Sequence, residues 1–247
     1  MGDAPFSVET LGDQAMLVRF ASESTRKCFD RIRYFEQAVK RLSISGVIEL
    51  VPAYTSLAVY YNPLVIAEFE LRQRLLKITL TESITGDAVG ADSETIEASS
   101  SREIIVPVCY DREFGEDLAY VAQVHGLTIE EVVAIHTSAC YFVHMIGFLP
   151  GFPYLGGLSH RIATPRKESP RTFIAAGSVG IAGTQTGVYP IDSPGGWQII
   201  GRSPWQFFDP SAATPCRIQA GDTVKFNAIT RNEFGIIHKQ CMVRNGS

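Results

Sequence analysis

Glycine and proline are concentrated between residues 141 and 201 of this 247-residue chain, and this stretch constrains the fold more than any other. Two runs carry most of them, residues 147–156 (GFLPGFPYLG) and residues 177–197 (GSVGIAGTQTGVYPIDSPGGW). A packed core does not require such a density, whereas glycine and proline fix particular backbone angles and let backbone N–H groups approach another molecule closely. The stretch is therefore interpreted as a binding site.

Short apolar runs separated by Gly/Pro turns continue from here towards the end of the chain. They are residues 173–174, 188–189, 198–200, 205–208, 223–226 and 234–237. Short strands at such spacing favour a barrel or a sandwich. Ahead of them, residues 103–108 predict a strand, and Gly126 ends a helix that follows Asp117. A capping box, Thr128 with Glu131, starts a second short helix that runs to His136.

The N-terminal part, before residue 81, has a different pattern. Residues 15–20 predict a strand, and apolar residues at three- and four-residue steps predict a helix between residues 22 and 42. Residues 47–51 and 56–61 predict two more strands, and Asn62-Pro63 indicates the cap and first residue of a second helix to about Leu80. This order resembles a ferredoxin-like α+β unit, a scaffold with no chemistry of its own.

Residues 81–101 are poor in large apolar side chains and rich in Ser, Thr, Ala, Asp and Glu, as is typical of a linker. We therefore expect a small α+β domain over residues 1–85, a linker over residues 86–102 and a β-rich domain over residues 103–247.

Composition excludes several classes of function. A net charge of −4 and the absence of a Lys/Arg run argue against nucleic acid or an anionic membrane as the partner. We expect a cytoplasmic protein, because no leader and no apolar run of membrane-spanning length is visible. Five scattered cysteines predict free thiols, and no metal site is predicted. No G-x-x-x-x-G-K-[ST], G-x-S-x-G or H-E-x-x-H motif occurs.

The two glycine-rich runs, with Pro165-Arg166, Pro170-Arg171 and residues 193–202 (SPGGWQIIGR), resemble the KipI-like family, whose members are also called allophanate hydrolase subunit 1 or the B subunit of 5-oxoprolinase. The resemblance covers nearly the whole chain. It implies an α+β fold, with a small ferredoxin-like N-terminal domain followed by a cyclophilin-like β-barrel domain. It also implies two partners, a KipA-like C subunit and a LamB/YcsF-like A subunit, in an ATP-dependent 5-oxoprolinase that opens 5-oxoproline to glutamate.

Three functions are open at this point. Besides the oxoprolinase subunit, one branch of the family inhibits a sensor histidine kinase, and related domains form the carboxyltransferase part of urea carboxylase. No Walker A loop is present, so ATP is expected at a subunit interface or on the partner. A complete active site is not readable in this chain, which fits a subunit whose partner supplies the rest.

His136 is the candidate general acid or base, because an imidazole titrates near neutrality; the alternative is a histidine favoured by the end of a helix. Arg166 and Arg171 each follow a proline on a constrained loop, and their guanidinium groups suit a carboxylate or a phosphate. The alternative for an arginine is an ion pair with Asp192, Glu168 or a partner subunit.

The remaining candidates lie in the second glycine-rich run. The Gln185 amide can pair with a lactam or urea-type carbonyl and N–H, or can tie two turns together. The segment with Ser193, Gly195 and Gly196 can present backbone N–H groups to an oxyanion, with Trp197 as an apolar wall, or can be a tight turn with a core tryptophan. Tyr189 is also assigned to substrate or phosphate binding.

Overall fold

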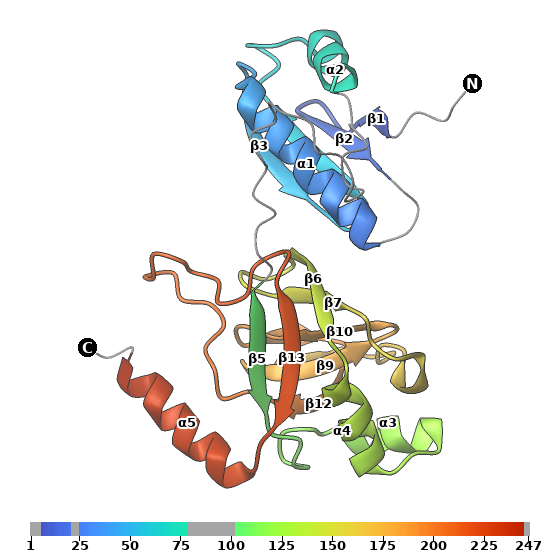
Figure 1. Cartoon of the computed structure of the whole chain (residues 1–247), viewed down its shortest axis with the longest axis vertical. Coiled ribbons are helices and arrows are strands. Elements are labelled where there is room, and N and C mark those ends of the chain that lie inside the picture. Colours follow the sequence, from blue (N-terminus) through green and yellow to red (C-terminus); the bar gives the residue numbers. More distant parts are fainter. Residues whose placement is uncertain (1–5, 21–24, 79–101, 245–247) are drawn as a thin grey trace, which may run out of the picture. The chain divides into compact units, whose positions relative to one another are not determined.

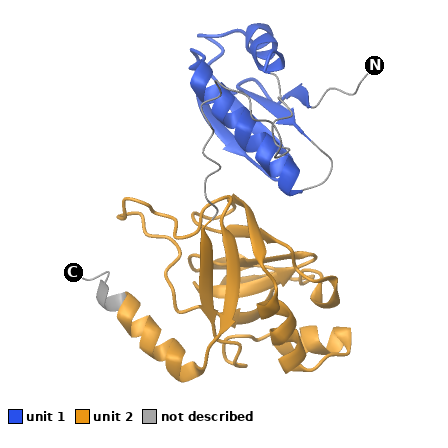
Figure 2. Cartoon of the chain, viewed as in Figure 1, with its two compact units in different colours: residues 1–95 blue, residues 96–247 orange. Residues whose placement is uncertain are grey.

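The computed structural model describes residues 6–20, 25–78 and 102–244, without the side chains of residues 242–244 (Figure 1). The chain divides into two compact units, residues 1–95 and 96–247, here called the N-terminal and C-terminal units (Figure 2). The predicted linker, residues 86–102, lies outside the described residues except for Arg102. The domain boundaries therefore stay a prediction.

The N-terminal unit is an antiparallel sheet in the order β1-β2-β4-β3. Its elements are β1 (Ser7–Thr10), β2 (Ala15–Arg19), α1 (Arg26–Leu42), β3 (Val47–Pro52), β4 (Ser56–Tyr61) and α2 (Glu68–Leu76). The apolar stripe of α1, including Ile32, Phe35 and Val39, packs with inward-facing residues of the sheet such as Leu57 and Val59. The predicted strands and first helix are confirmed, while β1 is an additional strand.

The second predicted helix begins later than expected. Asn62 does not cap it, because the Asn62 side-chain oxygen accepts from Leu64 N at 3.0 Å and its carbonyl accepts from Val65 and Ile66 N. These bonds form a local turn of the kind that asparagine side chains favour. Helix α2 starts at Glu68 instead, so the prediction of a helical start at Pro63 is wrong, and Leu80 lies outside the described residues.

The C-terminal unit is built on a seven-stranded mixed sheet in the order β12-β9-β10-β7-β6-β13-β5. Reciprocal backbone hydrogen bonds of 2.9 Å between Cys109 and Arg202 link the two ends of this sheet, which makes it a nearly closed barrel. The predicted barrel architecture is thus confirmed. The elements are β5 (Glu103–Val108), α3 (Leu118–His125), α4 (Ile129–Ser138), β6 (Tyr141–Ile146), β7 (Pro153–Gly156), η1 (His160–Ile162), β8 (Arg171–Ile174), β9 (Ser178–Ala182), β10 (Gln185–Val188), β11 (Ser193–Gly195), β12 (Gln198–Arg202), β13 (Thr223–Ala228) and α5 (Arg231–Arg244).

Two of the predicted strands are wrong. Residues 205–208 form no strand, and only Phe208 makes an isolated bridge, to Cys216. Residues 234–237 lie in helix α5, because Thr230 and Glu233 cap its first turn with reciprocal hydrogen bonds of 3.2 and 2.7 Å. The capping box at Thr128 and the left-handed Gly126 after α3 are confirmed.

Within the part of the chain described, no single helix is long and apolar enough to cross a membrane; only the bent pair α3 and α4, taken together, passes by length and composition.

A second, smaller core lies beside the main core of the barrel. It consists of Phe152, Ile174, Ala182, Tyr189, Trp197 and Ile199, and we call it the aromatic cluster. Phe152 touches the rings of both Tyr189 and Trp197 edge to face, with ring centroids 5.3 Å apart in each pair. This cluster supports the region in which most of the predicted site residues lie.

Candidate functional site

The loop of residues 164–171 is anchored along its length to neighbouring strands. The Pro165 carbonyl accepts a hydrogen bond of 3.0 Å from Gln198 Nε2, and Lys167 N donates to the Gly196 carbonyl at 2.7 Å. The Thr164 carbonyl accepts from Gly183 N at 2.8 Å. Because prolines 165 and 170 also restrict the backbone, the side chains of this loop start from fixed positions.

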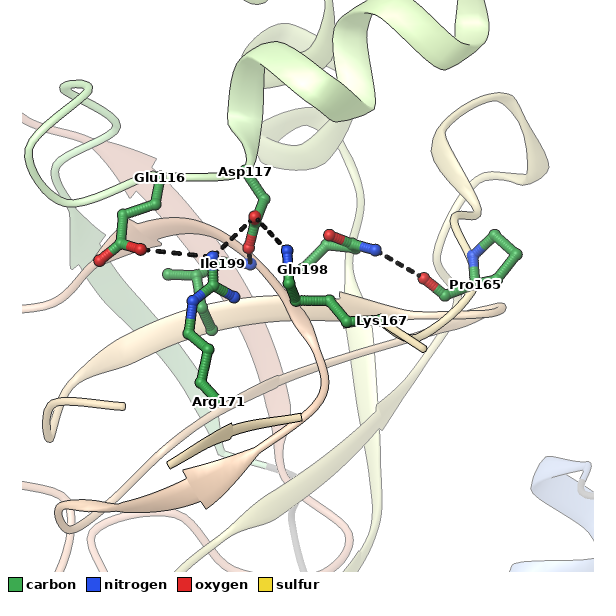
Figure 3. A network of polar contacts seen from close by, with 7 residues as sticks. All are labelled: Glu116, Asp117, Pro165, Lys167, Arg171, Gln198 and Ile199. Carbon is green, nitrogen blue, oxygen red and sulfur yellow. Dashed lines mark hydrogen bonds and ion pairs between the residues drawn. The ribbon is translucent and has the colours of Figure 1, made fainter. Parts of the chain in front are cut away.

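Asp117, which precedes α3, fixes the far end of this loop (Figure 3). Its Oδ1 accepts from Arg171 Nη2 at 2.7 Å and from Lys167 Nζ at 3.1 Å, while Oδ2 accepts from Ile199 N at 2.7 Å. The Asp117 backbone N–H in turn donates to the Ile199 carbonyl at 2.9 Å. Burial of this carboxyl raises its pKa, but the hydrogen bonds, that of Arg171 first, prevail and hold the pKa below its usual value.

Arg171, the first residue of β8, forms ion pairs with Asp117 and Glu116. Its hydrogen bond to Asp117 raises its own pKa, and Glu116 lies 3.3 Å from the same Nη2 atom. The arginine therefore pairs with Asp117 and Glu116, and not with Asp192 or Glu168. Its other terminal nitrogen, Nη1, is buried and has no hydrogen-bond partner among the described residues. Ligand binding by Arg171 stays a prediction, and the contacts described make it an anchor of the loop.

Arg166 differs from the other two cations of the loop. It is exposed, and its guanidinium carbon lies 5.9 Å from the centroid of the Trp197 ring, within the range of a cation–π contact. It forms no ion pair with any residue that the structure describes. The loop thus presents one guanidinium group that is available to an anion.

Trp197 lies under Arg166, and the rings of Tyr154 and Tyr189 lie beside Trp197, each with its centroid 6.4 Å away. Burial raises the pKa of Tyr154, and that of Tyr189 to about 12, while the positive charge of Arg166 opposes both shifts. Trp197 and Tyr189 are buried in the aromatic cluster, so the structural alternative of a core tryptophan is confirmed. Tyr154 is half-buried, and its ring centroid lies 6.4 Å from that of Trp197.

The segment around Gly195 is a strand. β11 pairs with β8, so that Gly195 lies opposite Arg171. A side chain at Gly195 would collide with the Tyr189 hydroxyl and approach Ile174 to 2.8 Å, whereas at Gly196 the nearest atom is 3.7 Å away. Gly195 is thus required for close packing. Ser193 is buried and its hydroxyl has no partner among the described residues. Oxyanion binding by this segment stays a prediction.

His136 lies in the main core of the barrel, apart from the loop. It is fully buried, with Nδ1 2.7 Å from the Tyr110 hydroxyl and Nε2 3.0 Å from Thr186 Oγ1, and it stacks on Phe226 at 4.5 Å. Burial lowers its pKa to about 3, so the imidazole is neutral in the folded chain. These contacts are those of a core histidine, and a catalytic role stays a prediction.

Gln185 is half-buried at the start of β10, opposite Ala182 and two residues beyond the turn that contacts Thr164. Its pairing with a ligand stays a prediction.

Phe148 is a further feature that the sequence did not single out as a contact residue. It is exposed and has a left-handed backbone, with φ of 69°, which is unusual for a side chain of this size. Its ring meets Phe152 of the aromatic cluster edge to face at 5.7 Å. Strained exposed residues of this kind are concentrated at functional sites.

Asp117 and Lys167 are the other residues that sequence reasoning missed. Asp117 follows Glu116 directly before a helix, and acidic residues are common there for local reasons. Among the residues described, no three His, Cys, Asp or Glu side chains are arranged to hold a metal ion. The geometry is that of an anchored loop that presents an exposed cation beside an aromatic cluster.

Known proteins share the sequence and fold of this chain. The family described as carboxyltransferase domain, subdomain C and D, matches residues 6–218. The B subunit of 5-oxoprolinase from Bacillus subtilis (strain 168) is 43% identical over 233 residues, covering 93% of this chain and 95% of that protein.

Two solved structures show the same fold in longer chains. That of TTHA0988 superposes with a TM-score of 0.72 at 32% identity, covering 88% of this chain but only 40% of that one. The Kluyveromyces lactis urea carboxylase gives a TM-score of 0.74 at 21% identity, covering 96% of this chain and 23% of the other. At this identity the urea carboxylase shows the fold alone. In both cases the counterpart of this chain is one part of a longer polypeptide.

Proposed function

The chain belongs to the carboxyltransferase-domain family (subdomains C and D) that includes the B subunit of 5-oxoprolinase, and on this premise we propose that it is the B subunit of an ATP-dependent 5-oxoprolinase. Such a complex opens the lactam of 5-oxoproline to glutamate. The observation that carries the proposal is the 43% identity to the Bacillus subtilis protein over 95% of that protein's length. The proposed location is the cytoplasm.

The chemistry of the reaction explains why ATP is required. An unstrained lactam is a poor electrophile, and ATP supplies a phosphoryl group that turns the carbonyl oxygen into a leaving group. Arg166 and the aromatic cluster fit the binding and orientation of the substrate. Asp117 is not free to act as a general base, because it is held as a carboxylate by two cations and the Ile199 N–H. The proton transfers are therefore assigned to groups on a partner subunit.

The proposed partners are a KipA-like C subunit and a LamB/YcsF-like A subunit. The TTHA0988 chain supports association with at least one further domain, since the counterpart of the present chain occupies only 40% of that longer polypeptide. ATP is assigned to a subunit interface or to a partner, because this chain has no Walker A loop.

The finer fold assignments belong to the same proposal. The N-terminal unit is proposed to be ferredoxin-like, with β1 in the place of that fold's fourth strand in the order β1-β2-β4-β3, and the nearly closed barrel is proposed to be cyclophilin-like.

Reconstitution tests the function. The chain is co-expressed with the KipA-like and LamB/YcsF-like subunits of its host, and ATP-dependent release of glutamate from 5-oxoproline is measured with and without this chain. Urea and allophanate serve as alternative substrates in the same assay. We expect turnover of 5-oxoproline by the complete set only. No glutamate from the complete set, or faster turnover of urea or allophanate, would refute the proposal.

A further inference from the structure

Most polar groups of the residues beside Arg166 are occupied by contacts within the chain, although Arg171 Nη1 and Gln198 Oε1 are buried without a partner among the described residues. Lys167 and Arg171 both donate to Asp117, and Gln198 donates to the Pro165 carbonyl. The backbone on each side of Arg166 is therefore fixed, while its guanidinium has no carboxylate partner among the described residues. A loop with this pattern presents one guanidinium group, in a fixed position, to an anionic group of a ligand or of another chain.

We propose that Arg166 binds the carboxylate of the substrate, a small cyclic amide with one carboxylate group, and that Asp117 is a positioning residue for it. The inference rests on the proposed function and specifies the substrate contact. A single free guanidinium offers one planar fork, which matches one carboxylate in a bidentate pair. A nucleotide triphosphate requires several cations, and the two neighbouring cations are already neutralised by Asp117 and Glu116.

The surroundings of Arg166 fit the rest of such a ligand. Trp197 lies beneath the guanidinium, and Tyr154, which is half-buried, adjoins Trp197. With the carboxylate on Arg166, the lactam ring packs against the exposed part of Tyr154, because Trp197 is only 5% exposed and lies under the guanidinium. The carboxylate also replaces the water around the guanidinium with a charge-assisted hydrogen bond.

Asp117 acts on the substrate only through the loop. It holds Lys167, which directly follows Arg166, and Arg171 at the end of the loop. The aspartate is buried, and both of its carboxylate oxygens already accept hydrogen bonds from within the chain. Its loss should release the loop and spread the orientations of Arg166.

Fluorescence of Trp197 provides a direct binding assay on the full chain. The sequence has two tryptophans, Trp197 and Trp205, and Trp205→Phe leaves Trp197 as the single reporter. 5-Oxoproline and 2-pyrrolidinone, the same ring without the carboxylate, are titrated separately. We expect a saturable change with 5-oxoproline at concentrations about 10- to 100-fold lower than with 2-pyrrolidinone, the range that one charge-assisted hydrogen bond provides.

Arg166→Ala should abolish this preference for the carboxylate, and Arg166→Lys should restore part of it, because lysine retains the charge without the fork. Arg217→Ala is the control: it removes the arginine that lies 4.4 Å from the Trp205 ring centroid, and it should leave the preference unchanged in the reporter chain, where Phe stands at position 205. Circular dichroism checks that each variant is folded. A preference that survives Arg166→Ala, or equal binding of the two ligands by the parent chain, would overturn the proposal.

Kinetics of the assembled complex separate this inference from the proposed function. Arg166→Ala should raise KM for 5-oxoproline about 10- to 100-fold and leave KM for ATP unchanged. Asp117→Asn should raise KM for 5-oxoproline without affecting the use of 2-pyrrolidinone, which a general loss of folding would not do. A complex with no glutamate release refutes the proposed function, while the fluorescence titration still decides whether Arg166 binds the carboxylate.

Discussion

Replacement of Asp117 by alanine should destabilise the C-terminal unit by about 3 kcal/mol, near the lower end of the usual cost for a buried ion pair. The side chain of Asp117 is 7% exposed and accepts hydrogen bonds from Arg171, Lys167 and Ile199. Removal of one partner from a buried ion pair costs about 3–5 kcal/mol. The lower end applies here, because Lys167 is 31% exposed and Arg171 21% exposed, so water replaces part of the lost interaction.

Thermal unfolding measures this effect. Both tryptophans lie in the C-terminal unit, so their fluorescence follows the unfolding of that unit. About 3 kcal/mol corresponds to a fall in Tm of about 6–12 °C for a unit of this size. The Tm of Asp117→Asn, which keeps an acceptor for Ile199 N, should lie between the Tm of the parent chain and that of Asp117→Ala. Glu116→Gln is the control, because that side chain is 65% exposed and its loss should cost less than about 0.5 kcal/mol. A Tm for Asp117→Ala within about 2 °C of the parent, roughly the effect of 1 kcal/mol, would refute the reasoning.

Three further predictions concern other parts of the C-terminal unit. His136 is neutral in the folded chain, where its pKa is about 3, against about 6.5 in the unfolded chain, so the free energy of unfolding should fall as the pH drops below about 6.5. Urea unfolding should show a free energy of unfolding about 2 kcal/mol lower at pH 5 than at pH 7. His136→Phe should remove this difference. Gly195→Ala should lower the free energy of unfolding in urea by about 1–3 kcal/mol, because the added methyl group collides with the Tyr189 hydroxyl, whereas Gly196→Ala should be tolerated. An equal loss for the two variants would contradict the packing described. Phe148→Gly should be more stable than Phe148→Ala by about 1 kcal/mol, since glycine adopts the positive φ without strain, and the reverse order of their unfolding midpoints would argue against a strained loop.

Local sequence signals predicted much of the fold because they depend on contacts between residues only a few positions apart. Thr128 and Glu131 form the predicted capping box, and Gly126 adopts the left-handed conformation that ends α3. One of the wrong strand predictions also has a local cause, because two local signals competed there. The aromatic and β-branched residues 234–237 favour a strand, but the cap at Thr230 and Glu233 starts a helix there.

The site was predicted less completely, because its key contact joins distant parts of the chain. Arg166 and Arg171 were found from their place after prolines in a polar loop, yet Arg171 pairs with Asp117, 54 residues earlier. No periodicity or spacing encodes such a pair. Sequence alone also left two interpretations of His136 open, a catalytic residue and a histidine favoured by the end of a helix. The same helix end is compatible with exposure or burial, and only the packing of Tyr110, Thr186 and Phe226 around the ring shows that it is buried.

The measurement that tests the central claim most directly is the simultaneous release of ADP and glutamate by the reconstituted complex, with this chain present or left out. We predict that ADP and glutamate form in equal amounts from ATP and 5-oxoproline, and that both fall to background without this chain. Glutamate release at an undiminished rate in its absence would contradict the claim that this chain is a required part of an ATP-dependent 5-oxoprolinase.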